Sequence, residues 1–378
     1  MKNYILILIA VALFLGSCKE SAKQSNQSSL VVESFEIDTI MIDSKGYFFY
    51  LAEALGKSFL SHETGVLYNL NQKKPQLELV DLNALTLLDS IPLEREGPIG
   101  IGNYPIYDKF QLTKNGEILI FAWEELVKLT SDRTQVVKYR FDQLPLVGDT
   151  LLANEVVRYR GLVTEDGKYY IGYYGNANDT HSRLGLVKIN LEDLTVKKIN
   201  LPLFQELVPY EIKTKTTSEY PYTYVEGIFL AQVGDQLLVS STPVNEVYRV
   251  DIESGKYERI SYSSNLTANK VEINYPTVNT QSEGVYERWK QVSFYKWEWD
   301  ETSQLFWRIT NQTFVDSEIQ PNKVHLTFFD KNLNQVGEIK LPDDWKIMGA
   351  PFFFQGMYWQ FINIDDEMAF VRFKPRFD

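Results

Sequence analysis

The stretch GIFLAQVGDQLLVSSTPVNEVYRVDIESGKYERISY, residues 227–262, predicts two β-hairpins in succession. Its apolar, aromatic and β-branched residues fall into four short runs, and such residues favour the pleated surface of a sheet. Val233-Gly234-Asp235 separates the first two runs, and its glycine accepts the positive φ that a tight hairpin turn requires. Asp and Ser residues separate the last two runs. Two consecutive hairpins build one four-stranded antiparallel sheet.

This unit recurs along the chain. A comparable first hairpin occupies Phe110–Phe121, Gly161–Tyr174 and Trp297–Thr310. A comparable second hairpin occupies Gln76–Leu93, Glu125–Phe141, Gly185–Leu203 and Lys323–Pro342. Four-stranded sheets that recur roughly every 50 to 60 residues are typical of a β-propeller, so we expect an all-β fold.

The two ends of the repeat region are incomplete, and each has what the other lacks. Pro351–Phe373 supplies only three strands, whereas the early strand Val32–Ile42 has no hairpin partner. Pairing them would complete the last blade and remove the sheet edges that invite aggregation. We therefore expect six blades closed by the N-terminal strand. Seven blades stay open because Ser263–Tyr286 is hard to assign, and two β-sandwiches are the alternative fold.

The composition supports a large folded domain with an acidic surface. The 378 residues are 44% hydrophobic and 23% charged, which is enough to bury a core. Lys and Arg number 38 and Asp and Glu 50, giving a formal net charge of −12. Such a chain is not expected to bind nucleic acid or an anionic membrane surface.

Cysteine and histidine are scarce. The chain has one cysteine and three widely separated histidines, His62, His181 and His325, which exclude an internal disulfide and a thiolate or HExxH metal site. We expect no cofactor and no transition metal, and oxygen ligands leave Ca²⁺ as the only ion to consider. The glycines of Gly97–Gly102 are spaced G-x-x-G-x-G, unlike a dinucleotide loop, and favour a tight connection between blades.

The N-terminus has the features of an export signal. Lys2 provides a positive charge and an apolar run follows from Tyr4 to Leu15. Leu15-Gly16-Ser17-Cys18 resembles the lipobox of bacterial lipoproteins, in which the cysteine is acylated and becomes the new N-terminus. An uncleaved anchor with an incidental cysteine is the alternative. We expect a signal peptide at 1–17, a lipidated Cys18 with a flexible polar tether at 18–31, and a single propeller domain at 32–378.

These features together resemble a known family. The lipobox, the polar tether, the aromatic-rich six-bladed repeat and the segment Glu96–Gly102 are similar to a Bacteroidetes family of propeller-type lipoproteins that carry a domain of unknown function. The resemblance covers essentially the whole mature chain and implies the propeller and the lipid anchor. It implies no activity, so no catalytic residue is assigned.

The segments that join one blade to the next are expected to form the ligand-binding face. They are long and rich in aromatic and charged residues, which suit recognition of a protein or a saccharide. The candidate residues are Arg95, Glu96, Asn103, Tyr104, Arg160, Tyr222, Glu226, Arg288, Trp289 and Trp345. The alternative for each is that it packs a loop onto a blade.

We expect a non-catalytic binding module for a protein partner or a saccharide, with the lipid as its only membrane contact. Its place is the bacterial envelope, anchored to the outer membrane, with the body in the periplasm or at the cell surface. Two alternatives stay open: a glycan hydrolase or lyase with carboxylates facing the channel, and an envelope assembly scaffold. Fold alone does not choose between them.

Replacing Cys18 with Ala should release the protein from the membrane or leave it unprocessed, because the acyl chains then have no attachment site. Each buried CH₂ of an acyl chain contributes about 0.8 kcal/mol to anchoring. Membrane fractionation and the intact mass of the mature form measure the effect. Unchanged fractionation together with an unchanged mass would contradict a lipid anchor at Cys18.

Overall fold

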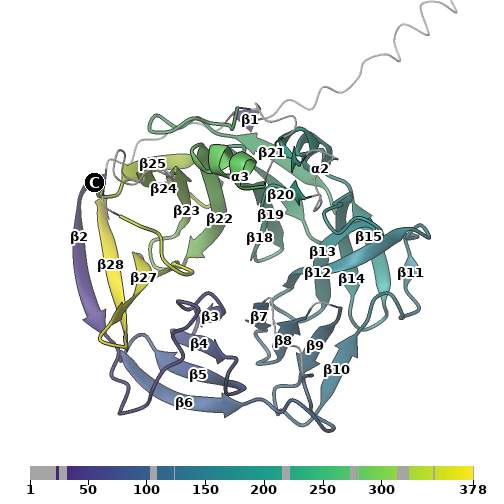
Figure 1. The fold of residues 1–378 in the computed structure, drawn as a ribbon, viewed down its shortest axis with the longest axis horizontal. Helices are drawn as coiled ribbons and strands as arrows, with labels where there is room; N and C mark the ends of the chain where they lie inside the picture. The colour runs from purple at the N-terminus through teal and green to yellow at the C-terminus, as the bar shows by residue number, and fades with distance from the viewer. Residues whose placement is uncertain are drawn as a thin grey trace, which may run out of the picture.

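The protein forms a ring of six small β-sheets arranged about a common axis (Figure 1). The computed structural model describes residues 23–24, 32–102, 109–122, 124–214, 222–272, 278, 281–312, 323–343 and 345–377. Over these residues each blade has four antiparallel strands, and two blades carry one extra short strand. The predicted six-bladed propeller is confirmed. The two-sandwich alternative is wrong, and the described part of Ser263–Tyr286 adds no seventh blade.

The strands follow one another around the ring. Blades 1 and 2 consist of β3 (Ser58–Ser61), β4 (Val66–Asn71), β5 (Gln76–Asp81) and β6 (Thr86–Pro92), then β7 (Lys109–Leu112), β8 (Ile118–Phe121), β9 (Leu126–Leu129) and β10 (Val136–Tyr139). Blade 3 consists of β12 (Glu155–Val163), β13 (Tyr169–Asn176), β14 (Gly185–Asn190) and β15 (Thr195–Ile199), with β11 (Val147–Gly148) parallel to β15 at its edge.

Blade 4 consists of β18 (Ile228–Val233), β19 (Gln236–Ser241), β20 (Glu246–Asp251) and β21 (Tyr257–Ser261). Blade 5 consists of β22 (Val292–Asp300), β23 (Leu305–Gln312), β24 (Lys323–Phe329) and β25 (Gln335–Lys340). Blade 6 consists of β26 (Phe352–Phe354), β27 (Met357–Ile364), β28 (Glu367–Phe377) and β2 (Val32–Met41). The connections contain α2 (Leu203–Glu206), the 3-10 turn η1 (Val208–Tyr210), the strand pair β16 (Ile212–Lys213) and β17 (Thr223–Tyr224), and α3 (Gln281–Trp289).

The N-terminal strand closes the ring, as predicted. β2 pairs antiparallel with β28 from Val32 opposite Phe377 to Met41 opposite Ala369, and Figure 1 shows the two strands side by side. The Nε of Arg372 donates to Asp38 Oδ1 at 2.8 Å, and Arg376 pairs with Glu36. Blade 6 is therefore built from both ends of the chain.

The connection that leaves β2 is held by a buried carboxylate. Glu78 of β5 is fully buried and accepts hydrogen bonds from the side-chain amides of Asn69 (2.8 Å) and Asn71 (2.9 Å). It also accepts from the backbone N–H of Tyr50 (3.1 Å) and the hydroxyl of Tyr47 (3.2 Å). These neutral donors satisfy a charge that burial would otherwise destabilise, and they tie the connection after β2 to blade 1.

The glycine turns have the conformations that their sequences indicate. Gly116, Gly167 and Gly234 have φ of 78°, 77° and 56°, at the hairpins between β7 and β8, β12 and β13, and β18 and β19. The segment Gly97–Gly102 is a compact turn, with the Gly100 N–H donating to the Gly97 carbonyl at 3.0 Å. A Cβ on Gly100 would lie 2.8 Å from the Arg95 carbonyl oxygen, so this turn needs glycine there.

The strand order assigns the loops to two faces of the ring. Four antiparallel strands reverse direction three times, so the connection between blades and the turn between the second and third strands lie on one face. We call this the connection face. The opposite face carries the other two hairpins of each blade. Helices α2 and α3 belong to connections and so lie on the connection face (Figure 1).

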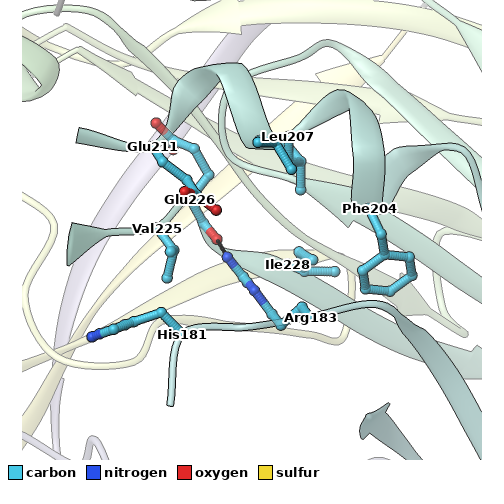
Figure 2. Close-up of a pocket in the computed structure, with 9 residues that line it drawn as sticks. His181, Arg183, Phe204, Leu207, Glu211, Val225, Glu226 and Ile228 are labelled. Atoms are coloured by element: carbon cyan, nitrogen blue, oxygen red, sulfur yellow. Dashed lines mark hydrogen bonds between the residues drawn. The ribbon is translucent and has the colours of Figure 1, made fainter. Parts of the chain in front are cut away.

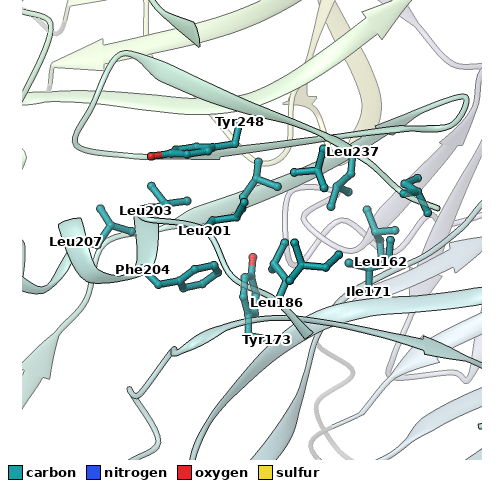
Figure 3. Close-up of a cluster of buried hydrophobic side chains, with 14 residues drawn as sticks. Leu162, Ile171, Tyr173, Leu186, Leu201, Leu203, Phe204, Leu207, Leu237 and Tyr248 are labelled. Atoms are coloured by element: carbon teal, nitrogen blue, oxygen red, sulfur yellow. The ribbon is translucent and has the colours of Figure 1, made fainter. Parts of the chain in front are cut away.

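The space between blades 3 and 4 is filled by a cluster of apolar side chains (Figure 3). Ile171 and Leu186 of blade 3 face Leu237 of blade 4, all fully or almost fully buried. Phe204 and Leu207, from α2 and the residue after it, cover this cluster toward the connection face. Burial of apolar surface contributes about 25 cal/mol per Å², so this apolar cluster is the main interaction that holds blades 3 and 4 together.

Part of the predicted tether contacts the propeller. Lys23–Gln24 forms the short strand β1, which pairs parallel with Ile260 and Ser261 at the edge of blade 4. Cys18 and the predicted signal peptide lie outside the described residues. In the ranges that are described, no helix is long and apolar enough to cross a membrane.

Deleting Val32–Ile42 should abolish cooperative melting or cause aggregation, because it exposes β28 as an open sheet edge. The matched control deletes Lys19–Ser29, which among the described residues removes the two residues of β1. That deletion should leave the melting temperature nearly unchanged in calorimetry. Equal behaviour of the two deletions would contradict closure of the ring by β2.

Candidate functional site

The predicted ligand-face residues fall into two groups. Arg95 and Glu96 are exposed between β6 and β7, where the Arg95 Nη2 donates to the Gln72 carbonyl at 2.9 Å. Trp345 is half-buried and packs edge-on against Tyr358, with 5.9 Å between ring centroids. Asn103 and Tyr104 lie outside the described residues.

The second group gathers around blades 3, 4 and 5. Arg160 is exposed in β12, Tyr222 is half-buried next to β17, and Trp289 ends α3 with 48% of its surface exposed. Glu226 and Arg288 lie between them but inside the protein. The structure therefore brings together five of the ten predicted residues.

Glu226 and Arg288 form a buried ion pair. The Nε of Arg288 donates to Glu226 Oε1 at 2.5 Å and its Nη2 donates to Oε2 at 2.9 Å, while both side chains are 1% exposed or less. The hydroxyl of Thr242 donates to Glu226 Oε2 at 2.5 Å, and Arg288 Nη1 donates to the Val292 carbonyl at 3.0 Å. Neither charged group faces solvent. Their role on this face is to fix α3 to the segment before β18.

A small recess lies beside this ion pair (Figure 2). It is shallow, with an enclosed volume of about 30 Å³. Its walls come from the turn between β13 and β14, from α2 and η1, and from the segment leading into β18. The lining residues are His181, Arg183, Phe204, Leu207, Val208, Glu211, Val225, Glu226 and Ile228.

The charged side chains around the recess differ in their partners. Arg183 donates from Nη2 to the backbone carbonyl of Glu226 at 2.6 Å. The carboxylate of Glu226 is bound by Arg288, and that of Glu211 pairs with Lys213 at 2.8 Å. Burial lowers the pKa of Arg183, because a cation in a recess loses hydration, whereas the nearby charges of Glu211 and Glu226 act in the opposite direction.

Aromatic rings border the recess. The His181 ring meets Tyr222 edge-to-face, with 6.1 Å between centroids. On α3, Tyr286 and Trp289 form a second edge-to-face pair at 6.1 Å and expose 45% and 48% of their surfaces. Arg288 lies between them in the chain, so its buried ion pair with Glu226 holds the helix that carries these rings.

Arg183 and α3 were not predicted. Arg183 lies in a turn between the second and third strands of blade 3, whereas the predicted ligand-face residues come from connections between blades. The topology of the repeat places both kinds of loop on one face, which is the signal that would have found it. For α3 the signal is Thr280-Gln281-Ser282-Glu283, which has the spacing of a capping box.

The remaining histidines do not join the recess. His62 is exposed in the turn between β3 and β4, on the opposite face. His325 is 4% exposed in β24, and burial, with Lys340 and Lys323 nearby, lowers its pKa to about 4. A histidine that is neutral and buried in a strand packs as part of blade 5.

Residues 28–340 match the family described as a domain of unknown function, DUF4221. The chain belongs to this family. The predicted membership is confirmed. A DUF4221 family member from Bacteroides vulgatus has a similar structure, with a TM-score of 0.64 at 13% identity over 94% of this chain and 100% of that one.

A protein from Bacteroides fragilis, described as exported, is also similar, with a TM-score of 0.52 at 13% identity over 94% of this chain and 99% of that one. At such identities the likeness establishes the propeller fold alone. The comparison with curated proteins gave no match.

Replacing either member of the buried ion pair should destabilise the protein, because the other charge is left buried without a partner. Glu226→Gln or Arg288→Met should lower the free energy of unfolding by about 3–5 kcal/mol, and the double variant should recover part of the loss. The matched control is Lys290→Gln in the exposed Lys290–Glu287 pair, where about 0–1 kcal/mol is expected. Denaturant unfolding measures all four variants. Similar losses for Lys290→Gln and Arg288→Met would contradict the assigned role.

Proposed function

We propose that this protein is an exported, lipid-anchored binding module of the bacterial envelope that takes its ligand on the connection face. The ligand site is the recess between blades 3 and 4 together with the aromatic pair on α3. The ligand is a saccharide or a partner protein.

The observation that carries this proposal is the exposed pair Tyr286 and Trp289 on α3, the helix that Arg288 joins to Glu226 in the wall of the recess. Each ring leaves nearly half of its surface in solvent, although aromatic rings gain most from burial. The chain nevertheless holds α3 in place with a buried ion pair. Exposed aromatic side chains on a fixed support, next to a concave site, are typical of binding surfaces.

The recess supports binding rather than catalysis. General acid–base cleavage of a glycosidic bond needs two facing carboxyl groups several Å apart. The two carboxylates that line the recess are each occupied by a cation, Glu226 by Arg288 and Glu211 by Lys213. Neither is placed to act as a paired acid and base.

The sequence supports the cellular location. The apolar segment after Lys2 and the single cysteine at position 18 fit export and lipidation. The similar protein from Bacteroides fragilis is described as exported. An acidic body on a lipid anchor would stay clear of an anionic bilayer surface.

A binding screen on saccharide and peptide arrays, followed by variants, tests the proposal. Trp289→Ala and Tyr286→Ala should each weaken binding of the best ligand tenfold or more without lowering the melting temperature much, because exposed rings contribute to binding and little to folding.

The matched control is Phe48→Ala, which removes an 89% exposed ring from the connection after β2, on the same face but outside the recess. It should leave affinity unchanged. Normal binding by both α3 variants, with loss on changing Asn115 or Asp166 in the hairpin turns, would place the site on the opposite face and contradict the proposal.

A further inference from the structure

The outer edge of β2 is the longest sheet edge that no described segment covers. Three other blades have part of the same chain bonded to their outermost strands. Asp43 exchanges hydrogen bonds with Leu85 and Leu87 at β6, β11 pairs with β15, and β1 pairs with β21. The outermost strands β10 and β25 have four and six residues, whereas β2 has ten and no such cover among the described segments (Figure 1).

Alternate residues of β2 direct their backbone hydrogen-bonding groups to this open edge. The Ile42 N–H donates to the Met368 carbonyl at 2.9 Å, in continuation of the ladder between β2 and β28. In an antiparallel ladder every second residue bonds to the neighbouring strand, so the even-numbered residues of β2 face β28. The odd-numbered residues from Phe35 to Met41 therefore direct their N–H and C=O groups outward. A row of such groups is a template for a further strand.

The side chains of the same odd-numbered residues form an apolar strip. Phe35, Ile37 and Met41 expose 38%, 44% and 45% of their surfaces, and Thr39 between them is also exposed. Successive side chains of a strand point to opposite faces of the sheet, so these four lie on one face. The ring of Phe35 packs against the buried ring of Phe373 with 4.7 Å between centroids, which fixes one end of the strip.

The acidic residues of β2 lie on the other face and are neutralised within the molecule. Glu36 pairs with Arg376, and Asp38 pairs with Arg372, both on β28. Because each carboxylate already has a cation, two copies of β2 can approach without opposing unpaired charges. The strand also contains neither lysine nor proline, which proteins commonly use to block pairing at a sheet edge.

We propose that the outer edge of β2 pairs antiparallel with β2 of a second copy of this chain, joining the two copies of blade 6 into one continuous sheet. A two-fold axis places odd-numbered residues opposite odd-numbered residues, so the outward backbone groups bond to each other and the two apolar strips meet. β2 is thus complementary to itself in length, in hydrogen-bonding pattern and in its apolar face. The dimer does not depend on the proposed ligand site.

Sedimentation equilibrium of the detergent-solubilised full chain, over a range of protein concentrations, tests the inference. The chain should form a dimer. The dimer should become tighter as salt is added, because each chain has a formal net charge of −12 and screening weakens the repulsion between copies.

Two variants assign the contact to β2. Ile37→Lys places a charge in the apolar strip, and Thr39→Pro removes an outward N–H while leaving the bonds to β28 intact. Each should weaken the dimer about tenfold or more. Both should keep the Ile42 N–H protected in hydrogen exchange, which shows that the ring is still closed. If Thr39→Pro loses that protection, Ile37→Lys decides.

The matched control is Leu152→Lys, which changes a 60% exposed leucine beside blade 3, across the ring from blade 6. It should leave the dimer unchanged. A chain that stays monomeric, a dimer that Ile37→Lys does not weaken, or equal weakening by Leu152→Lys would overturn the inference. Open-ended assembly instead of a dimer would also overturn it, because a two-fold contact closes on itself.

Discussion

The antiparallel pairing of β2 with β28 is the constraint on which the rest of the structure depends. It joins residues 334 positions apart, as in the pair Asp38 and Arg372, and completes the only blade that the repeat leaves unfinished. The entropic cost of closing so long a loop grows only with the logarithm of its length, so the contacts between β2 and β28 can offset it once the ring exists. Its non-local character also predicts slow folding. The hydrogen bonds that Glu78 accepts from Tyr47 and Tyr50 also fix the connection that follows β2 to blade 1.

The candidate site is a consequence of how closed blades pack. Phe204 and Leu207 belong both to the buried wedge between blades 3 and 4 and to the lining of the recess (Figures 2 and 3). The Tyr173 hydroxyl of blade 3 donates to the Ile228 carbonyl of blade 4 at 3.1 Å. The floor of the recess is thus held by the same contacts that hold the two blades together. A ligand that binds there would meet a rigid, preformed surface.

Local sequence signals account for the blades but not for the pairing of charges. Gly116 and Gly167 could be assigned to turns because a positive φ is a property of one or two residues. The closing strand could be assigned because a three-stranded blade and an unpartnered strand complement each other. Glu226 and Arg288 were expected to face solvent, since charged residues usually do. Each is buried because it pairs with the other, 62 positions away in the chain, and a local sequence pattern does not predict a contact between such distant residues.

Native-state hydrogen exchange of β2 tests ring closure by the N-terminal strand most directly. The N–H of Ile42, which donates to the Met368 carbonyl at 2.9 Å, and the β2 amides bonded to β28 are the reporters. If closure holds the ring together, these amides exchange only with global unfolding and share the opening free energy of inner strands such as β18 and β22. Exchange of β2 at a much lower opening free energy, with the inner strands still protected, would contradict the account.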